Sequence, residues 1–304
     1  MNYKYNKTKR KKTNKKGKKG NKGKRKTQKK LIKDKCSPSK KLNYSCYDKE
    51  VLNILKNAWN KKNPKNKIKT KTPKQIWNQL KNKNKMCNRE SCWLEQPFVN
   101  DTNLKLKIKH KTFAPDYPKS WLKNSSEWLS SLDILNVMKQ YEKEYDNFKF
   151  IGPSPIDYDT KQYSDNCVCN NLCNFNLQNE IANNNTKIGI VFNLDTHDKP
   201  GSHWVALFIN TKKKDIYYFD SYGEPTPSNI NKLVKNIQKQ ANDNGINYNY
   251  FYNDNRHQFK NTECGMYCLY FIISMLKNKS FNYFLNNDIS DLFVFKKRKE
   301  YFNF

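Results

Sequence analysis

Residues 188–220 read IGIVFNLDTHDKPGSHWVALFINTKKKDIYYFD. They contain three apolar runs, at 188–194, 203–210 and 215–220, which are separated by a polar loop and by a lysine-rich turn. Short apolar runs bounded by polar segments are typical of buried strands. We therefore predict three strands of one sheet, and the short turn indicates that the last two pair antiparallel.

Further elements are predicted before and after these strands. Apolar residues recur at helical spacing in 126–141 and in 228–241, and each segment starts at a serine that could cap the helix. The run GMYCLYFIISML at 265–276 is long and apolar enough for a buried helix, whereas NYNYFYN at 247–253 alternates as a strand does. The amphipathic segment 280–304 is expected to pack on the same domain. Together these patterns predict an α+β fold in which a short sheet is flanked by helices.

The first 125 residues have a different composition. Residues 1–35 are rich in Lys, Asn and Gly, and such a segment cannot bury enough apolar surface to offset its ordering entropy. In the following stretch, helices are predicted at 48–60 and from 73 to 80, and the alternation LKLKI at 104–108 predicts a strand. We therefore expect three parts: a disordered basic tail (1–35), an accessory arm (36–125) and a larger domain (126–304).

The chain is strongly basic, with a formal net charge of +32. Residues 1–30 contain 16 of the 59 Lys and Arg residues and no Asp or Glu. Such an excess predicts an acidic partner, which could be nucleic acid, an anionic surface or an acidic protein. No apolar stretch reaches about 18 residues, so no membrane span is expected. The basic N-terminus is not followed by an apolar segment, so it does not fit a secretory signal.

The nine cysteines are odd in number and scattered, which predicts mostly thiols in a reducing compartment rather than a disulfide scaffold. Cys167, Cys169 and Cys173 lack the paired C-x₂-C spacing of a zinc ribbon. Cys87 and Cys92 are mis-spaced for a zinc knuckle. We therefore expect no metal site and no cofactor.

Four residues in the second half of the chain fit the chemistry of a cysteine protease. Cys264 stands at the start of the apolar helix, where the helix N-terminus favours a thiolate. His203 begins one predicted strand and Asp220 ends the next, so antiparallel pairing would bring base and orienting carboxylate together. Gln258 could donate to the oxyanion beside the backbone N–H of Cys264. Gly265 is expected to let the substrate backbone approach closely.

Other residues could take these roles. Cys268 lies one turn into the apolar helix, where it would be buried and inert. His257 adjoins Gln258, but no following strand supplies a matching Asp, so a loop role is expected. His197 lies in a polar loop and fits a surface position. Taken singly, a histidine or a cysteine at the end of an element is usually structural; the ordered set carries the prediction.

Three strings resemble the catalytic motifs of the ubiquitin-like-protein-specific cysteine proteases, whose superfamily includes the adenovirus protease: GSHW (201–204), YYFDSYG (217–223) and HQFKNTECGMYCLY (257–270). The order His, Asp, Gln, Cys matches, as does Trp204 directly after His203. The pair at 128–129, Trp-Leu, resembles the pair that often opens that catalytic domain. The resemblance implies a papain-like cysteine protease fold of the adenovirus-protease type, with a short mixed sheet flanked by helices.

A nearer likeness is to the virion-maturation proteases of large DNA viruses of eukaryotes. It covers residues 36–304, includes the ending around Arg298, and is carried by four further strings: SCY (45–47), CWLEQPF (92–98), IGPSPIDY (151–158) and FNLDTH (192–197). Some viral relatives carry Asn where this chain has Asp220. The third member of the triad is therefore expected to be less critical than His203 and Cys264.

This likeness implies a function. The substrate would be a viral polyprotein or structural precursor, cut after Gly-Gly-type sites during particle maturation. Trp204 and Trp128 would form a narrow substrate-binding slot that has no room for side chains. The protein would act in the virion and the host cytoplasm, with the host nucleus as a further location.

Two other functions remain open. The same catalytic centre could remove ubiquitin-like modifiers from host proteins. Alternatively, the chain could be a non-enzymatic nucleic-acid-binding virion protein, since polycations bind phosphate backbones without special motifs. Charge alone does not explain the ordered motifs, so our hypothesis is that the basic tail (1–30) tethers a protease to nucleic acid or to the particle interior.

Overall fold

The computed structural model describes residues 31–39, 41–162 and 166–304. Residues 31–304 form one compact unit. Most of the predicted disordered tail lies outside the described residues, but its last five residues belong to the folded unit, where Asp34 is buried and accepts from the backbone N–H of Ser91 at 2.9 Å. The predicted boundary between an arm and a larger domain near residue 125 stays a prediction.

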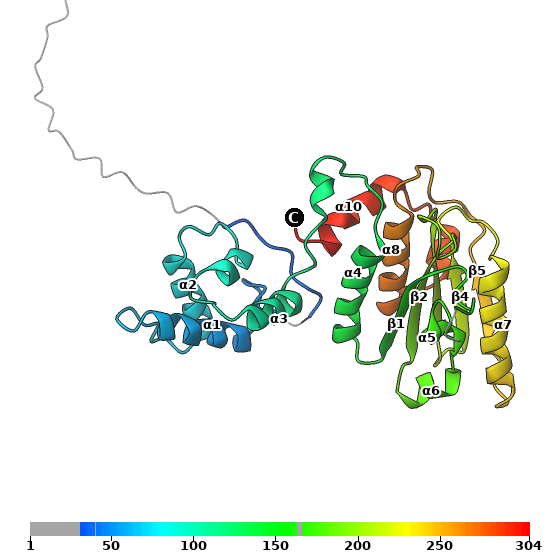
Figure 1. Cartoon of the computed structure of the whole chain (residues 1–304), viewed down its shortest axis with the longest axis horizontal. Coiled ribbons are helices and arrows are strands. Elements are labelled where there is room, and N and C mark those ends of the chain that lie inside the picture. Colours follow the sequence, from blue (N-terminus) through cyan, green and yellow to red (C-terminus); the bar gives the residue numbers. More distant parts are fainter. Residues whose placement is uncertain (1–30, 40, 163–165) are drawn as a thin grey trace, which may run out of the picture. The chain divides into compact units, whose positions relative to one another are not determined.

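The sheet has five strands in the order of the sequence (Figure 1): β1 (Phe148–Pro155), β2 (Lys187–Asn193), β3 (Trp204–Asn210), β4 (Asp215–Phe219) and β5 (Asn249–Tyr252). The central pairs β2–β3 and β3–β4 are antiparallel, whereas β1–β2 and β4–β5 are parallel. The predicted strands are confirmed as β2 to β5. Strand β1 was not predicted, because its sequence FKFIGPSP contains a glycine and two prolines that normally interrupt a strand.

Helices cover both faces of the sheet, as Figure 1 shows. On one face lie α4 (Ser131–Glu144) and α8 (Cys264–Leu276), followed by α9 (Asn282–Asn286) and α10 (Asp291–Tyr301). The other face is covered by α7 (Ser228–Asn242), with α5 (Asn170–Cys173) and α6 (Leu177–Ala182) beside it. This is the α+β architecture with a mixed sheet that the sequence predicts.

Strand β3 shows why the central strands are apolar throughout. Trp204, Ala206 and Phe208 face α4 and α8, and Val205 and the alternate residues after it face α7. Successive side chains of a strand point to opposite faces, and both faces are covered here. A continuous apolar run is therefore the pattern that this position requires.

The N-terminal part of the described chain has its own hydrophobic cluster, centred on Trp93 and Tyr47. It contains α1 (Lys49–Lys62), α2 (Pro73–Lys83), the 3₁₀ turn η1 (Ser91–Glu95) and α3 (Thr102–Thr112), and a second 3₁₀ turn, η2 (Lys119–Leu122), precedes α4. The two predicted helices are confirmed as α1 and α2.

The prediction of a strand at 104–108 is wrong, because this segment lies inside α3. The side chain of Asp101 caps the helix by accepting from the backbone N–H of Leu104 at 3.0 Å. In a helix, Leu104 and Ile108 lie four residues apart on the packed side, while Leu106 is 47% exposed. The alternation of Leu and Lys is compatible with the two-residue period of a strand and with the 3.6-residue period of a helix. The cap at Asp101 favours the helix.

Helix α4 starts later than the predicted residue 126. Ser130 is its N-cap and forms a capping box with Asp133: the Asp133 carboxylate accepts from the backbone N–H of Ser130 at 2.8 Å, and the hydroxyl of Ser130 accepts from the backbone N–H of Asp133. Leu129 therefore precedes the helix, and it is buried. Residues 126–129 therefore lie before the helix, where the side chain of Leu129 is close to Gly265 at the start of α8.

The prediction of mostly free thiols is wrong. Six of the nine cysteines are in disulfides: Cys36–Cys46, Cys87–Cys92 and Cys167–Cys173. The other three, Cys169, Cys264 and Cys268, are free. An odd count says nothing about which cysteines the fold brings together, and here each pair is separated by ten residues or fewer.

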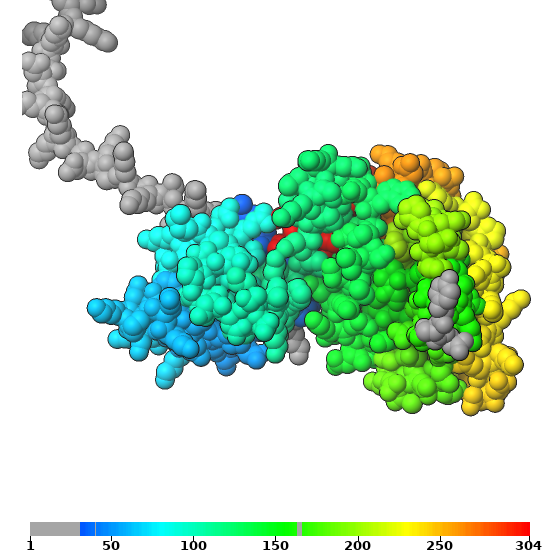
Figure 2. Space-filling model, in the orientation of Figure 1, coloured from blue at the N-terminus to red at the C-terminus, as the bar shows by residue number. Residues whose placement is uncertain are grey.

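The C-terminal residues pack against segments from the first half of the chain. Asn303 accepts from the backbone N–H of Lys35 at 2.8 Å, and its own backbone N–H donates to Pro115 at 2.8 Å. The rings of Phe304 and Tyr117 are stacked, with their centroids 4.5 Å apart. In Figure 2 the C-terminal residues, in red, are visible only in a narrow strip between cyan and green surfaces. Among the residues that the structure describes, no helix is long and apolar enough to cross a membrane.

Candidate active site

His203 and Asp220 meet at one end of the sheet. His203 directly precedes β3 and Asp220 directly follows β4, and these strands are antiparallel neighbours. The His203 Nε2 atom lies 2.6 Å from Oδ1 of Asp220, and both residues are buried. A carboxylate can only accept, so Nε2 carries the proton in this contact. The expectation that the two strands bring these residues together is confirmed by this distance.

Cys264 completes the group as the first residue of α8, where it is buried. Since Asp220 engages Nε2, the other ring nitrogen of His203 is available to the thiol. Burial lowers the pKa of His203, but hydrogen bonds to Asp220 and Cys264, and their charges, outweigh it and raise this pKa to about 9. The imidazole ring is therefore cationic at neutral pH, and an imidazolium at this position would favour the thiolate form of a neighbouring cysteine.

The backbone at Asp220 is fixed by a buried amide that the sequence analysis did not single out. Asn253 follows β5 and is fully buried. Its Oδ1 accepts from the Asp220 N–H at 2.9 Å, and its Nδ2 donates to the Asp220 carbonyl at 2.7 Å. The chain is rich in asparagine, so no pattern distinguishes this one.

Tyr222 covers one face of the His203 ring. The two rings are stacked, with centroids 4.4 Å apart and an interplanar angle of 9°. The Tyr222 backbone N–H also donates to Oδ1 of Asp220 at 2.9 Å, and the guanidinium of Arg256 lies 4.9 Å from the centroid of the tyrosine ring. Tyr222 lies within the YYFDSYG string but has no role in the sequence prediction.

Gln258 is fully buried in the loop before α8. Its Oε1 accepts from the hydroxyl of Ser221 at 2.7 Å, and its Nε2 donates to the Lys260 carbonyl at 2.5 Å. An amide has two N–H donors, so one remains after the bond to Lys260. The loop is held from α10, since Asp291 accepts from the backbone N–H groups of Phe259 and Lys260, both at 3.0 Å.

Glu263, the residue directly before Cys264, forms a buried ion pair with Arg298 of α10. Arg298 Nε and Nη2 each lie 3.0 Å from a carboxylate oxygen of Glu263, and both side chains are 2% exposed. Nη2 also donates to the Glu127 carbonyl at 2.8 Å. Burial raises the pKa of Glu263, and the bonds to Arg298 oppose this rise. The pair thus joins the start of α8, the segment before α4 and the C-terminal helix.

Trp204 and Gly265 pack against Leu129. The Trp204 Nε1–H donates to the Leu129 carbonyl at 3.1 Å. A Cβ atom at Gly265 would lie 3.0 Å from the Leu129 Cβ and 3.3 Å from Cδ1 of Trp204. A methyl group at this position would require Leu129 and Trp204 to shift by a few tenths of an ångström, so the packing favours glycine. The expectation that Gly265 lets a substrate backbone approach closely stays a prediction. Trp128 is 38% exposed, and the slot between Trp128 and Trp204 stays a prediction.

The competing residues occupy other positions. Cys268 is 1% exposed, and burial raises the pKa of its thiol well above the usual value, so it is an inert core residue. His257 lies in a loop as expected but is buried; its ring stacks on Phe219, and burial lowers its pKa. The Nδ1 atom of His197 lies 2.6 Å from Asp157, and its side chain is 40% exposed.

The fold and this group of side chains define the class as a cysteine-type protease. A family description, the Ulp1 protease family C-terminal catalytic domain, matches residues 137–302. This range is more than half of the chain and contains His203, Asp220 and Cys264. The chain therefore belongs to the Ulp1 protease family.

Individual relatives agree with this assignment. A protein of Acanthamoeba polyphaga mimivirus that is named as a thiol protease is 34% identical over 277 residues, which cover 90% of this chain and 83% of the relative. A cysteine protease of African swine fever virus is 26% identical over 235 residues, covering 71% of this chain and 83% of the relative. A crystal structure of the African swine fever virus protease shares the fold, with a TM-score of 0.64 over 88% of this chain and 95% of that one at 20% identity.

Proposed function

We propose that Cys264 is the nucleophile of this protease, His203 its general base and acid, and Asp220 the group that orients the imidazole. The observation that carries this proposal is the 2.6 Å contact between Nε2 of His203 and Oδ1 of Asp220. This contact leaves the other nitrogen of the imidazole ring available to Cys264. The buried acceptor fixes one tautomer and supports the imidazolium. The ring stack with Tyr222 restricts the imidazole further.

The reaction follows from these positions. The thiolate of Cys264 attacks the scissile carbonyl carbon and forms a C–S bond. His203 donates its proton to the leaving nitrogen as the C–N bond breaks, which leaves a thioester on the enzyme. Water then gives a proton to His203 and attacks the thioester. The C–S bond breaks, which regenerates the thiolate and releases a carboxylic acid that loses its proton to the solvent.

The oxyanion needs donors at the start of α8. The backbone N–H of Cys264 belongs to the first turn of this helix, where N–H groups have no helical partner. The uncommitted N–H of Gln258 is the second candidate, since the bonds to Ser221 and Lys260 fix its amide plane. Each donor is typically worth roughly 10²–10³ in rate.

The proposed substrates are viral polyproteins or structural precursors cut after Gly-Gly-type sites, during particle maturation in the virion and in the host cytoplasm or nucleus. The support comes from the relatives, which are named as a thiol protease of a mimivirus and a cysteine protease of African swine fever virus. Trp204, directly after His203, and the partly exposed Trp128 are proposed to select residues without side chains. The basic tail is proposed to tether the enzyme to nucleic acid.

A second candidate is the removal of ubiquitin-like modifiers. Relatives from other African swine fever virus isolates, at 25% identity, are named as SUMO-1 cysteine proteases. Such substrates also end in a Gly-Gly pair, so the catalytic centre would be the same. The two candidates differ in the protein that the surface around the centre recognises.

A cleavage assay separates these candidates. Wild type and Cys264→Ala are incubated with a peptide library biased to Gly-Gly-X sites, and with fluorogenic SUMO and ubiquitin conjugates. Cleavage of Gly-Gly-X peptides by wild type alone, with slow or no turnover of the conjugates, supports precursor processing. Preferential turnover of a conjugate supports deconjugation. Equal turnover by Cys264→Ala would contradict the assignment of the nucleophile.

A further inference from the structure

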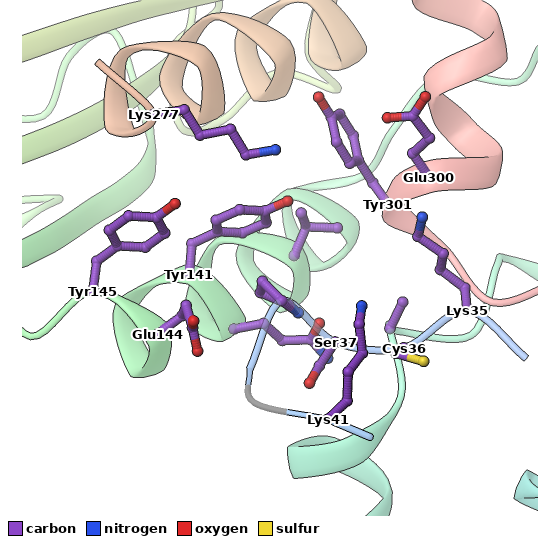
Figure 3. A pocket seen from close by; sticks show the side chains of 14 residues that line it. Lys35, Cys36, Ser37, Lys41, Tyr141, Glu144, Tyr145, Lys277, Glu300 and Tyr301 are labelled. Atoms are coloured by element: carbon purple, nitrogen blue, oxygen red, sulfur yellow. The ribbon is translucent and has the colours of Figure 1, made fainter. Parts of the chain in front are cut away.

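A cavity of about 270 Å³ is lined by residues that have no part in the proposed reaction. Figure 3 shows it between the residues around Lys35 and the helices α4, α8 and α10. Its volume is just below the range of about 300–1,000 Å³ that is typical of small-molecule sites. An occupant would therefore be a small ligand, and it would contact segments that are far apart in the sequence.

Lysines enter this cavity from different segments. Lys35 and Lys41 come from the N-terminal side, and Lys277 comes from the end of α8. In Figure 3, the ammonium groups of Lys41 and Lys277 reach into the open space from opposite sides. In the described part of the chain, none of these three ammonium groups has an ion-pair partner.

The acidic residues of the lining do not balance these lysines. Glu300 is paired with Lys297 at 2.8 Å, and that lysine is not part of the lining. Glu144 is then the remaining carboxylate, and it has no ion pair within the described ranges. Three unpaired ammonium groups therefore face one unpaired carboxylate, which leaves the cavity positive.

The cations also repel one another. Burial lowers the pKa of Lys35; the charge of Glu300 opposes this, and the smaller effects of Lys41, Lys277 and Lys297 lower the pKa further. A multivalent anion would relieve this repulsion.

Hydroxyl donors lie beside the ammonium groups. Tyr141 of α4 and Tyr145, which directly follows this helix, line the cavity, and in Figure 3 their hydroxyl groups are directed toward the same space as Lys277. Among the described residues, these two hydroxyls have no hydrogen-bond partner. Phosphate oxygens are strong acceptors of bonds from lysine and hydroxyl donors. We infer that this cavity binds a small multivalent phosphate, either a free polyphosphate or the triphosphate of a nucleotide.

The test is isothermal titration calorimetry of sodium tripolyphosphate, and separately of ATP, into the full chain at about 0.15 M salt. Wild type is expected to bind one equivalent saturably, and the melting temperature should rise with ligand. The double variant Lys35→Gln/Lys277→Gln should lose at least about tenfold in affinity, because it removes two charge-assisted hydrogen bonds to phosphate oxygens. Tripolyphosphate binding without ATP binding would assign a free polyphosphate, and tighter binding of ATP than of tripolyphosphate would assign a nucleotide triphosphate.

The matched control is Lys235→Gln/Lys239→Gln, which removes the same charge from the exposed face of α7. Its affinity should change less than about twofold, because it alters only the screened long-range field. Melting of both variants without ligand verifies that each is folded. Absence of saturable binding to wild type, or equal losses in the two double variants, would overturn the inference.

Discussion

Arg298 contacts both carboxylate oxygens of Glu263 at 3.0 Å, one residue before Cys264. The pair is almost fully buried, and the guanidinium also lies 4.3 Å from the centroid of the Trp121 ring. The pair thereby connects the C-terminal helix α10 to the residue that directly precedes α8.

Breaking this ion pair should destabilise the protein. Glu263→Gln or Arg298→Met leaves a buried charge without its partner, which typically costs about 3–5 kcal/mol. Denaturant unfolding of each variant, and of the double variant, measures this cost. The double variant should lose less than the sum of the single variants, because neither charge is then left alone.

The surface pair on the same helix supplies the control. Lys297 and Glu300 lie 2.8 Å apart, and their side chains are 18% and 51% exposed, whereas those of Arg298 and Glu263 are each 2% exposed. Lys297→Gln should change the unfolding free energy by no more than about 1 kcal/mol. Similar losses at the surface pair and the buried pair would show that the burial of Glu263 and Arg298 has no special role.

The pH dependence of peptidase activity should reflect His203. Its pKa is raised to about 9, so the imidazolium that protonates the leaving amine is present at neutral pH and is lost as the pH rises through about 9. We expect kcat/KM to fall along an alkaline limb near that pH. In Asp220→Asn the charge that helps to raise this pKa is absent, so the limb should move to lower pH and the maximum rate should fall. An alkaline limb at the same pH in this variant would show that Asp220 does not raise the pKa of His203.

Gly265→Ala tests the packing at the start of α8. Inside a helix this change usually stabilises by up to about 1 kcal/mol. Here the added methyl group would meet Leu129 at 3.0 Å, so we expect a loss of about 1–3 kcal/mol instead. Thermal or denaturant unfolding gives the sign directly. A more stable variant would show that Leu129 and Trp204 can move away without cost.

Tyr222 should matter for the reaction through its ring and not through its hydroxyl. Tyr222→Phe keeps the stack on His203, which has a centroid distance of 4.4 Å, and should retain most of kcat. Tyr222→Ala uncovers the imidazole and should lower kcat by at least about tenfold, since precise orientation of the base is part of catalysis. Equal activity of the two variants would contradict this role.

The parts of the fold that could be predicted from sequence are those whose pattern is local. The buried strands β2 to β4 and helix α8 are continuous apolar runs, and the flanking residues His203, Asp220 and Cys264 follow from where those runs begin and end. The central sheet and the contact between His203 and Asp220 were therefore predictable. The catalytic roles of these residues remain proposals.

The features that the sequence analysis missed depend on contacts between distant segments or on competing local signals. The pair Glu263–Arg298 joins residues 35 positions apart, in segments without any motif that links them. Alternating Leu and Lys at 104–108 fits a strand and a helix equally, and the cap at Asp101 decides it. Strand β1 was not predicted because its Gly-Pro step normally interrupts a strand. Its parallel pairing with β2 stabilises the strand nevertheless.

The most direct test of the central claim identifies the cysteine that becomes acylated. Wild type is mixed with an activated ester of a peptide that ends in Gly-Gly and quenched in acid during turnover, and digestion with mass spectrometry locates the thioester. The account predicts the acyl group on Cys264, its loss in Cys264→Ala, and an unchanged adduct in Cys268→Ala. An acyl group on Cys169 or Cys268, or continued turnover by Cys264→Ala, would contradict it.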